Sequence, residues 1–271
     1  MQLTSQDYAA ISEFLESQAG IRLGVAKEYL VSSRLVRLLE TYKLASFADL
    51  VVALKQPARR DVQGAVIDAM TTNETFWFRD VAHYSALTSG VLKDFSAMRL
   101  RIWSAAASTG QEAYSIAISL QDAMRSKELS ASLRYEILGT DISPTALRQA
   151  REARYCGVSA SRGLSDVQRN KYFRVQNDCI ELKPEYKQNI SFRDFNLLQP
   201  YDSLGRFDVV FCRNVLIYFS QERKREIIER FARCLNPGGY LFIGSTESMH
   251  GCDDLFEMKS VSGGLVYQKR N

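Results

Sequence analysis

Long hydrophobic runs are absent from this 271-residue sequence, and proline is scarce. No apolar run approaches the ~20 residues that a membrane-spanning helix needs, and the amino end, MQLTSQDYAAISEF, lacks the basic and apolar regions of a signal peptide. Five prolines and 15 glycines leave no room for a low-complexity linker, while 46% hydrophobic and 24% charged residues are ordinary for a globular chain. We therefore expect a soluble cytoplasmic protein without membrane insertion.

Cysteine and histidine are too few and too scattered for most metal or disulfide sites. The five cysteines include no CxxC pair, and the two closest, Cys234 and Cys252, are far apart in sequence. With only two histidines, the sequence predicts structural thiols, no disulfide framework and no metal. The net charge is +4, from 35 basic and 31 acidic residues, which is too small to indicate a nucleic-acid partner.

Residues 1–70 show a helical pattern throughout. Thr4 and Ser5 occupy possible N-cap positions and Gly20 a possible C-cap position of a first helix, around apolar residues at helical spacing. Three further helices are predicted at about 26–43, 46–55 and 59–70. The pattern indicates a small all-helical domain, a bundle of four short helices.

From residue 99 the pattern changes to strands alternating with helices. Such alternation predicts an α/β fold, with a doubly wound, mostly parallel Rossmann-like sheet over 99–271. The tail FEMKSVSGGLVYQK predicts a terminal antiparallel hairpin. Short β-like pieces at about 155–192 predict a small antiparallel β insertion, and 71–98 is expected to be a linker segment with a helix that closes the cleft.

Three loops after predicted strands are chemically distinctive, and open α/β sheets bind ligands at the carboxyl ends of their strands. Ala105–Gly110 (AAASTG) keeps the spacing of a glycine-rich nucleotide loop but has alanine at the first two glycine positions, so it predicts either a nucleotide-like ligand or tight strand–helix packing. Asp141 can accept hydrogen bonds from both hydroxyls of a ribose; the alternative is a helix N-cap, for which Ser143 is better placed. Arg213 and Asn214 follow the strand FDVVF, and either line a site or cap a turn.

The segment before the sheet, Thr71–Asp80 (TTNETFWFRD), fits neither an amphipathic helix nor a plain linker. Its three consecutive aromatic residues could hold two domains together. That alternative explains Asn73, Thr75 and Arg79 poorly, so a polar and aromatic cleft between domains is the sharper hypothesis.

Six motifs, in chain order, carry a resemblance to a known family. They are TTNETFWFRD, WSAAASTGQEAYSIAI, GTDIS, FNLL, FCRNVLIYF and NPGGYLFIGSTES. Together they resemble the chemotaxis receptor glutamate methyltransferases, the CheR family, along nearly the whole chain. The resemblance implies an S-adenosylmethionine-dependent methyltransferase sheet, S-adenosylhomocysteine as product, and chemoreceptor glutamate side chains as acceptors, which become γ-glutamyl methyl esters in sensory adaptation.

The resemblance also implies roles for single residues. It assigns donor binding to Asn73, Thr75, Arg79, Ala105, Glu112, Asp141, Asn196, Leu197, Arg213 and Asn214. In that assignment Asp141 holds the ribose, Glu112 lies beside the donor's amino group, and Asn196 with Leu197 flanks the adenine. Arg79 and Tyr218 are the implied catalytic residues, one holding the incoming carboxylate and the other close to the transferred methyl group. Gln111 departs from the family, since many relatives have Glu there.

The chemistry implied by the resemblance suits the residues present. A glutamate with a pKa near ~4.3 is already ionised at neutral pH and needs no general base. In-line displacement needs alignment, which alone can supply ~7–11 kcal/mol of the barrier, and exclusion of water. Methylation of RNA or a small molecule, or a role in a signalling pathway other than motility, is the alternative. An NAD dehydrogenase would require the glycine fingerprint that is missing here.

Two predictions concern partners. Lys27, Arg34 and Arg37 are predicted to contact the acidic methylation helix of a chemoreceptor, the alternative being an ordinary solvated basic face. Some relatives bind a receptor's carboxy-terminal pentapeptide at the edge of the β insertion, through a glycine-containing loop. Here Phe173–Leu182 (FRVQNDCIEL) contains no glycine and favours a tight hairpin. We therefore expect no pentapeptide tether, and we expect a monomer.

Overall fold

The computed structural model describes residues 2–24, 26–93, 95, 97, 99–249 and 251–270. The chain divides into two compact units. A helical unit comprises Met1–Thr72 and Tyr218–Arg223, and an α/β unit comprises Asn73–Ile217 and Lys224–Asn271. Among the described residues, no helix has both the length and the apolar character that crossing a bilayer requires.

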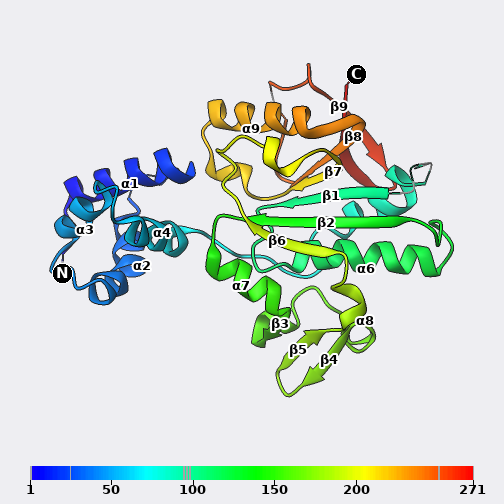
Figure 1. The fold of residues 1–271 in the computed structure, drawn as a ribbon, viewed down its shortest axis with the longest axis horizontal. Helices are drawn as coiled ribbons and strands as arrows, with labels where there is room; N and C mark the ends of the chain where they lie inside the picture. Colours follow the sequence, from blue (N-terminus) through cyan, green and yellow to red (C-terminus); the bar gives the residue numbers. More distant parts are fainter. Residues whose placement is uncertain are drawn as a thin grey trace. The chain divides into compact units, whose positions relative to one another are not determined.

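The helical unit contains the four predicted helices. They are α1 (Ser5–Ala19), α2 (Glu28–Thr41), α3 (Phe47–Leu54) and α4 (Arg60–Met70) (Figure 1). A capping box between Thr4 and Asp7 begins α1, and Gly20 ends it in the left-handed conformation at φ 69°. The side chains of Ile11, Leu35 and other apolar residues at helical spacing form a separate buried core.

The α/β unit is built on a seven-stranded sheet with the order β6-β2-β1-β7-β8-β10-β9. The strands are β1 (Arg99–Ala105), β2 (Arg134–Asp141), β6 (Ile190–Asp194), β7 (Phe207–Cys212), β8 (Leu235–Ile243), β9 (Phe256–Val261) and β10 (Gly264–Lys269). All neighbours from β6 to β8 are parallel, whereas β10 pairs antiparallel with β8 and β9. The predicted doubly wound sheet with a terminal hairpin is therefore confirmed.

Helices cover both faces of this sheet. The chain runs from β1 through β2 towards β6 on one side of the sheet, and from β7 to β8 on the other side. These opposite directions place α6 (Gln111–Arg125) and α7 (Pro144–Glu152) on one face and α9 (Gln221–Cys234) on the other (Figure 1). The alternating side chains of β1 follow this division. Ile102 is buried in the core that includes α6, while Trp103 packs edge-on against Phe231 of α9. The short helix α5 (Val81–Ala86) and the π-helical turn Leu87–Val91 precede the sheet, and α5 packs against β10.

The predicted β insertion is a three-stranded antiparallel sheet with the order β3-β5-β4, on the α7 side of the main sheet (Figure 1). It contains β3 (Arg154–Cys156), α8 (Asp166–Tyr172), β4 (Phe173–Gln176) and β5 (Cys179–Leu182). Because Gln176 pairs with Cys179, only Asn177 and Asp178 form the β4–β5 turn. Asn177 adopts φ 54° there, which asparagine tolerates well.

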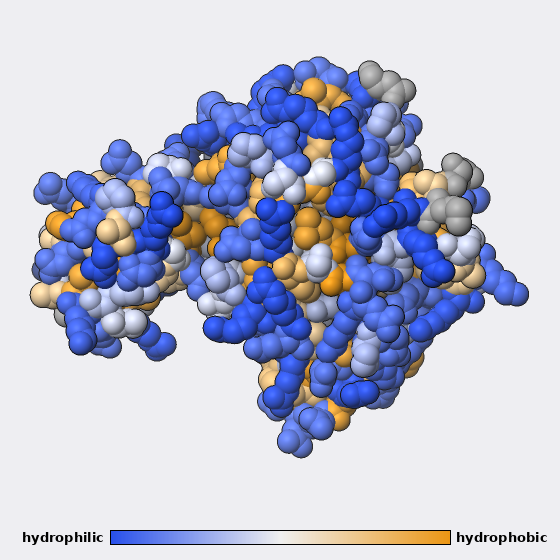
Figure 2. Space-filling model, viewed as in Figure 1, coloured by the Kyte–Doolittle hydropathy of each residue, from blue (hydrophilic) through white to orange (hydrophobic). Residues whose placement is uncertain are grey.

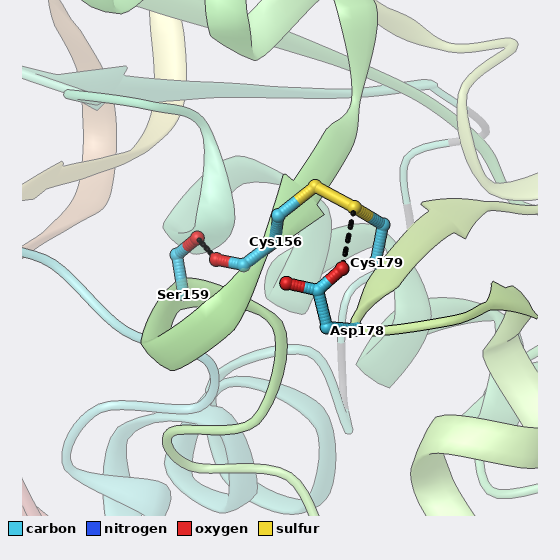
Figure 3. Close-up of a disulfide and its surroundings, with 4 residues drawn as sticks. All are labelled: Cys156, Ser159, Asp178 and Cys179. Carbon is cyan, nitrogen blue, oxygen red and sulfur yellow. Dashed lines mark hydrogen bonds between the residues drawn. A yellow bond between two sulfur atoms is a disulfide. The ribbon is translucent and has the colours of Figure 1, made fainter.

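One sequence expectation about cysteine was wrong. Cys156 of β3 and Cys179 of β5 are directly paired across the insertion, and their sulfurs form a disulfide (Figure 3). The two cysteines are 23 positions apart in sequence, and the chain between them folds back through α8 and β4, so sequence distance gave no sign of their proximity. Cys212, Cys234 and Cys252 are buried free thiols, as expected.

Candidate active site

The carboxyl ends of four parallel strands bring the predicted residues of the α/β unit to one edge of the sheet. Ala105, the last residue of β1, lies level with Thr140 of β2 and with Cys212 of β7. Asp141 lies level with Asp194 of β6. The loops that carry Asn196–Leu197 and Arg213–Asn214 therefore begin beside Asp141 and Ala105.

Backbone amides fix the carboxylate of Asp141. The side chain is buried; Oδ2 accepts a hydrogen bond from the N–H of Ser108 at 2.7 Å and Oδ1 one from the N–H of Ser143 at 2.9 Å. Ser143 itself is the N-cap of α7, where its Oγ accepts from the N–H of Ala146. Asp141 is thus oriented at the sheet edge by the small-residue loop, and the alternative capping role belongs to Ser143.

The segment before α5 joins the same group of loops. Asn73 Nδ2 donates to Ser143 Oγ at 3.3 Å, and the carbonyl of Asn73 accepts from Ser108 Oγ at 2.9 Å. Thr75 and Arg79 of this segment are half-buried. Trp77 and Phe78 are buried in the core of the α/β unit itself, while Asn73 reaches the loops beside Asp141.

Arg213 connects three segments behind the sheet edge. Its side chain is only 2% exposed. Nη1 donates to Glu112 Oε2 at 3.2 Å, and Nη2 donates to Asp80 Oδ2 at 2.6 Å and to the carbonyl of Arg79 at 2.7 Å. Glu112, in the first turn of α6, also accepts from Ser104 Oγ at 2.7 Å. Arg213 therefore holds Glu112 and the Arg79–Asp80 turn in place.

This network contains titrating groups whose pKa values are shifted. Burial raises the pKa of Glu112, against the opposing effect of the Arg213 guanidinium. Burial acts in the same direction on Asp80, but hydrogen bonding and charge attraction from Arg213 leave its pKa below the ordinary value. Burial, with a further contribution from Arg213, lowers the pKa of His83 from 6.5 to about 4, so His83 is neutral at neutral pH. Groups with such shifts cluster at functional sites.

Glu247 is a residue of this edge to which sequence reasoning gave no role. Its Oε2 accepts from the N–H groups of Asn214 and Gly244, both at 2.7 Å, and Oε1 accepts from the N–H of Ile217 at 3.2 Å. Three backbone donors on one carboxylate tie the loop after β7 to the loop after β8. The only available signal was its place in the motif GSTES after a buried strand.

The side chain of Asn214 has a buried oxygen without a hydrogen-bond partner in the described part of the protein. Among the described residues, Asn214 Oδ1 is inaccessible to solvent and has no hydrogen-bond partner. A buried polar atom without a partner is costly unless a bound molecule completes its hydrogen bonding. Together with the oriented Asp141 and the small side chains of Ala105–Ala107, this fits a ligand that offers hydroxyl and amino donors.

Other predicted residues have simpler surroundings. Asn196 Oδ1 accepts from the N–H of Leu198, and Leu197 is buried. Tyr218 belongs to the helical unit, where its carbonyl accepts from the N–H of Arg22 at 3.1 Å. Tyr218 is therefore assigned to the helical unit, whereas Asp141 and Arg213 belong to the α/β unit.

The predicted receptor-binding residues all lie in the helical unit. Lys27, the N-cap residue of α2, and Arg37 are exposed. Arg34 is half-buried, and its Nη1 donates to the carbonyls of Met70 and Thr71 at 3.0 and 3.1 Å. Arg34 thus completes the carboxyl end of α4 as well as contributing charge.

Within the described residues, one cluster of three side chains has the ligand atoms for a metal ion. Cys156, Asp178 and Cys179 bring two sulfurs and a carboxylate oxygen within 4.8 Å of one another. Both sulfurs are joined in the disulfide, and thiolates are the species that bind metals. The oxidised cluster therefore does not offer a metal site.

Comparison with known proteins gives a consistent result along the chain. The family described as CheR methyltransferase, all-alpha domain, matches residues 6–71, and CheR methyltransferase, SAM binding domain, matches residues 73–264. The chemotaxis protein methyltransferase Cher2 of Pseudomonas putida is 41% identical over 97% of this chain and 98% of its own length. The chemotaxis protein methyltransferase of Vibrio parahaemolyticus is 42% identical, over 98% of each chain.

Proposed function

We propose, because this chain belongs to the CheR methyltransferase family, that it transfers the methyl group of S-adenosylmethionine to glutamate side chains of chemoreceptors. The family includes a SAM-binding domain that matches residues 73–264. The single observation that carries the proposal to this chain is the convergence of oriented Asp141, Asn73 and the unsatisfied Asn214 Oδ1 at one sheet edge. The products would be γ-glutamyl methyl esters and S-adenosylhomocysteine.

The residues at the edge suit the functional groups of this donor. Asp141, held by two amides, can accept hydrogen bonds from the two ribose hydroxyls, and Asn196 with Leu197 can flank the adenine. The carboxylate of Glu112 can face the donor's amino group, and Asn214 Oδ1 can accept another of its hydrogen bonds. Asn73, Thr75 and Arg79 would contact the methionine end.

The protein's part in the reaction is to bind, align and exclude water. When bound, S-adenosylmethionine supplies a methyl group activated by its sulfonium. Arg79 would hold the incoming glutamate carboxylate and Tyr218 would orient it by a hydrogen bond. No side chain has to remove a proton, because that carboxylate is already ionised. Since opposite charges neutralise each other during transfer, a dry site favours the reaction.

Radiolabel transfer tests the function directly. The purified protein is incubated with methyl-labelled S-adenosylmethionine and membranes that contain or lack chemoreceptors. We expect label on the receptor band, released as methanol by mild base, as a carboxylate ester requires. Label on RNA or on a small molecule, or label stable to base, would contradict a glutamate acceptor.

Two variants test the residue roles. Asp141→Ala should weaken S-adenosylhomocysteine binding by ~1–3 kcal/mol through lost charge-assisted hydrogen bonds, while the exposed Asp202→Ala should bind normally. Wild-type affinity in a folded Asp141→Ala protein would refute the ribose assignment. Arg79→Ala should lose methyl transfer while keeping measurable product binding; an active Arg79→Ala variant would show that Arg79 does not hold the acceptor.

The same proposal extends to partners and location. We propose that the protein acts in the cytoplasm on the acidic methylation helices of receptors, using Lys27, Arg34 and Arg37, as a monomer and without a pentapeptide tether. The hydrophilic character of most of the face in Figure 2 supports a protein exposed to water. Light scattering of the purified chain should give about the monomer mass of 30.7 kDa.

A further inference from the structure

The β insertion carries a covalent bond that the proposed reaction does not use. We propose that Cys156 and Cys179 form a reversible thiol–disulfide exchange site, whose ligand is a small thiol or its disulfide, and that its state sets how tightly the protein holds its methyl donor. The second part of this inference rests on the proposed function.

The position of the pair suits exchange with a small molecule. Cys156 is exposed at the end of β3, whereas Cys179 is buried beside it on β5, next to the exposed Asp178 (Figure 3). Asp178 Oδ1 lies 3.5 Å from Cys179 Sγ and can accept its hydrogen bond when the sulfur is a thiol. An accessible sulfur with a resolving partner already in register is the arrangement that exchange needs. In the cytoplasm proposed for this protein, disulfides are usually transient ones.

The exchange is balanced with oxidised glutathione as the oxidant. The thiolate of Cys156 attacks one sulfur of that disulfide, which forms a mixed disulfide and releases the first glutathione thiolate. Cys179 Sγ then attacks Cys156 Sγ, which forms the protein disulfide and releases the second glutathione. The two protons lost by the cysteines end on the two glutathione thiols, and two electrons pass from protein to glutathione. A dithiol reduces the protein disulfide: one of its thiolates forms a mixed disulfide with a cysteine, and its second thiolate then closes a cyclic disulfide, which leaves both cysteines as thiols.

Two short chains of hydrogen bonds lead from this disulfide to the proposed donor site. Tyr155, adjacent to Cys156, donates its hydroxyl to the carbonyl of Thr109 at 2.7 Å, in the small-residue loop after β1. The carbonyl of Cys156 accepts from Ser159 Oγ at 2.8 Å (Figure 3), and the carbonyl of Ser159 accepts from Trp77 Nε1 at 3.0 Å.

Packing reinforces these chains. The ring of Tyr155 meets the ring of Trp77 edge-on, with 5.0 Å between their centroids, and Trp77 follows Asn73 and Thr75 in the segment proposed to contact the donor. The strand β3 has only three residues, and it is paired with β5 alone. The disulfide is therefore the strongest tie on β3, and its reduction loosens the strand that supports both the Thr109 loop and the Trp77 segment.

Reduction of the disulfide should weaken donor binding, because the loosened segments have to be ordered when the donor binds. A donor that needs both segments in place must order them itself when β3 is loose, so the reduced protein binds more weakly. We expect a difference of about fivefold, at the low end of measured couplings between sites. Linkage requires the reciprocal effect, namely that bound product makes the disulfide harder to reduce by the same factor.

The test measures S-adenosylhomocysteine affinity of the full chain by calorimetry after equilibration with oxidised glutathione or with dithiothreitol. Mass spectrometry after thiol alkylation reports the state of each cysteine. We expect about fivefold weaker binding by the reduced protein, and a matching shift of the glutathione equilibrium when product is present. Cys156→Ser and Cys179→Ser should each bind like the reduced protein in both buffers, and Cys252→Ser, which alters a buried free thiol, should keep the redox dependence. Tyr155→Phe should form the disulfide with a reduced affinity difference.

The following results would each overturn the inference. Equal affinity in both redox states would overturn it while leaving the proposed function intact, and so would Cys156 and Cys179 remaining thiols in oxidised glutathione. A redox effect that persists in both serine variants would assign it to other cysteines. Absence of product binding in either state would overturn the proposed function and, with it, the control of donor affinity.

Discussion

Replacing Arg213 by alanine should destabilise the protein far more than removing an ordinary surface arginine. The change leaves the buried Glu112 without its guanidinium partner and removes the donor that Asp80 and the carbonyl of Arg79 share. Within the described part of the chain, the hydroxyl of Ser104 is then the one hydrogen-bond donor left to the Glu112 carboxylate. An unpaired carboxylate then remains inside the α/β unit.

The magnitude follows from how deeply each partner is buried. Breaking a buried ion pair by removing one member costs ~3–5 kcal/mol. The Glu112 side chain is 12% exposed, and therefore bears most of this cost, whereas Asp80 at 28% can recover solvation. We expect the free energy of unfolding to fall by about 3–5 kcal/mol.

Denaturant unfolding followed by circular dichroism measures the loss, and the chain offers a matched control. Arg225 also contacts two carboxylates, those of Glu229 and Asp254, but all three side chains are well exposed. Arg225→Ala should therefore cost at most about 1 kcal/mol. Adding Glu112→Gln to Arg213→Ala should restore part of the loss, because the stranded charge is removed.

The loss should also depend on pH in a defined direction. Arg213 opposes the burial that raises the pKa of Glu112, so its removal raises that pKa further. The folded variant then holds a proton that the unfolded chain has released, and its stability falls as pH rises through the folded pKa. The destabilisation should be larger at about pH 8 than at about pH 5.5. A loss of unfolding free energy below about 1 kcal/mol for Arg213→Ala would refute the assigned network. Equal losses for Arg213→Ala and Arg225→Ala at both pH values would refute it too.

Three further predictions concern acid stability and partners. The pKa of His83 is lowered to about 4, so the unfolded chain takes up a proton before the folded protein does as pH falls. The free energy of unfolding should therefore drop by up to about 3 kcal/mol between pH 6.5 and 4. In denaturant unfolding, His83→Leu should show a smaller drop over the same pH range. Reversing charge at Lys27 and Arg37 together should lower receptor methylation at low salt more than at high salt, whereas reversal at Lys55 and Arg60 should not; equal rates would remove the receptor-face proposal. Calorimetric titration with a receptor tail ending in the pentapeptide should show no binding, and micromolar affinity would contradict the proposed absence of a tether.

Local patterns were sufficient to predict the four N-terminal helices and the strands of the main sheet. The second helix, predicted at about 26–43, spans Glu28–Thr41, and Gly20 has the left-handed conformation expected of a C-cap. These features depend on neighbours within a few residues, for which periodicity and cap preferences are direct signals. The class of sheet follows as well, because strands that alternate with helices pair mostly in parallel. Residues at strand ends, Asp141 above all, could therefore be placed at one edge without a structure.

The role of Arg213 and the disulfide could not be predicted in the same way. The ion pair between Arg213 and Asp80 joins residues 133 apart in sequence, and neither neighbourhood contains a sign of the other. The resemblance assigns Arg213 to donor binding, whereas in the structure its guanidinium is buried and bound by protein partners. Cys156 and Cys179 meet only because a short insertion folds back on itself.

Charged side chains at this sheet edge hold backbone loops in place as well as offering contacts to a ligand. Ser108, Asp80 and Asn214 adopt positive φ values of 52°, 55° and 57°. Aspartate and asparagine tolerate this left-handed conformation, whereas at Ser108 it costs about 1–3 kcal/mol unless the surroundings enforce it. Each is anchored by a charged side chain: Ser108 through its N–H by Asp141, Asn214 through its N–H by Glu247, and Asp80 through its carboxylate by Arg213. The groups that sequence motifs single out as ligand contacts thus include groups that hold left-handed loops in the shape a ligand would meet. A variant of Asp141 or Arg213 changes the loops as well as the charges, and binding and stability have to be measured together to separate the two.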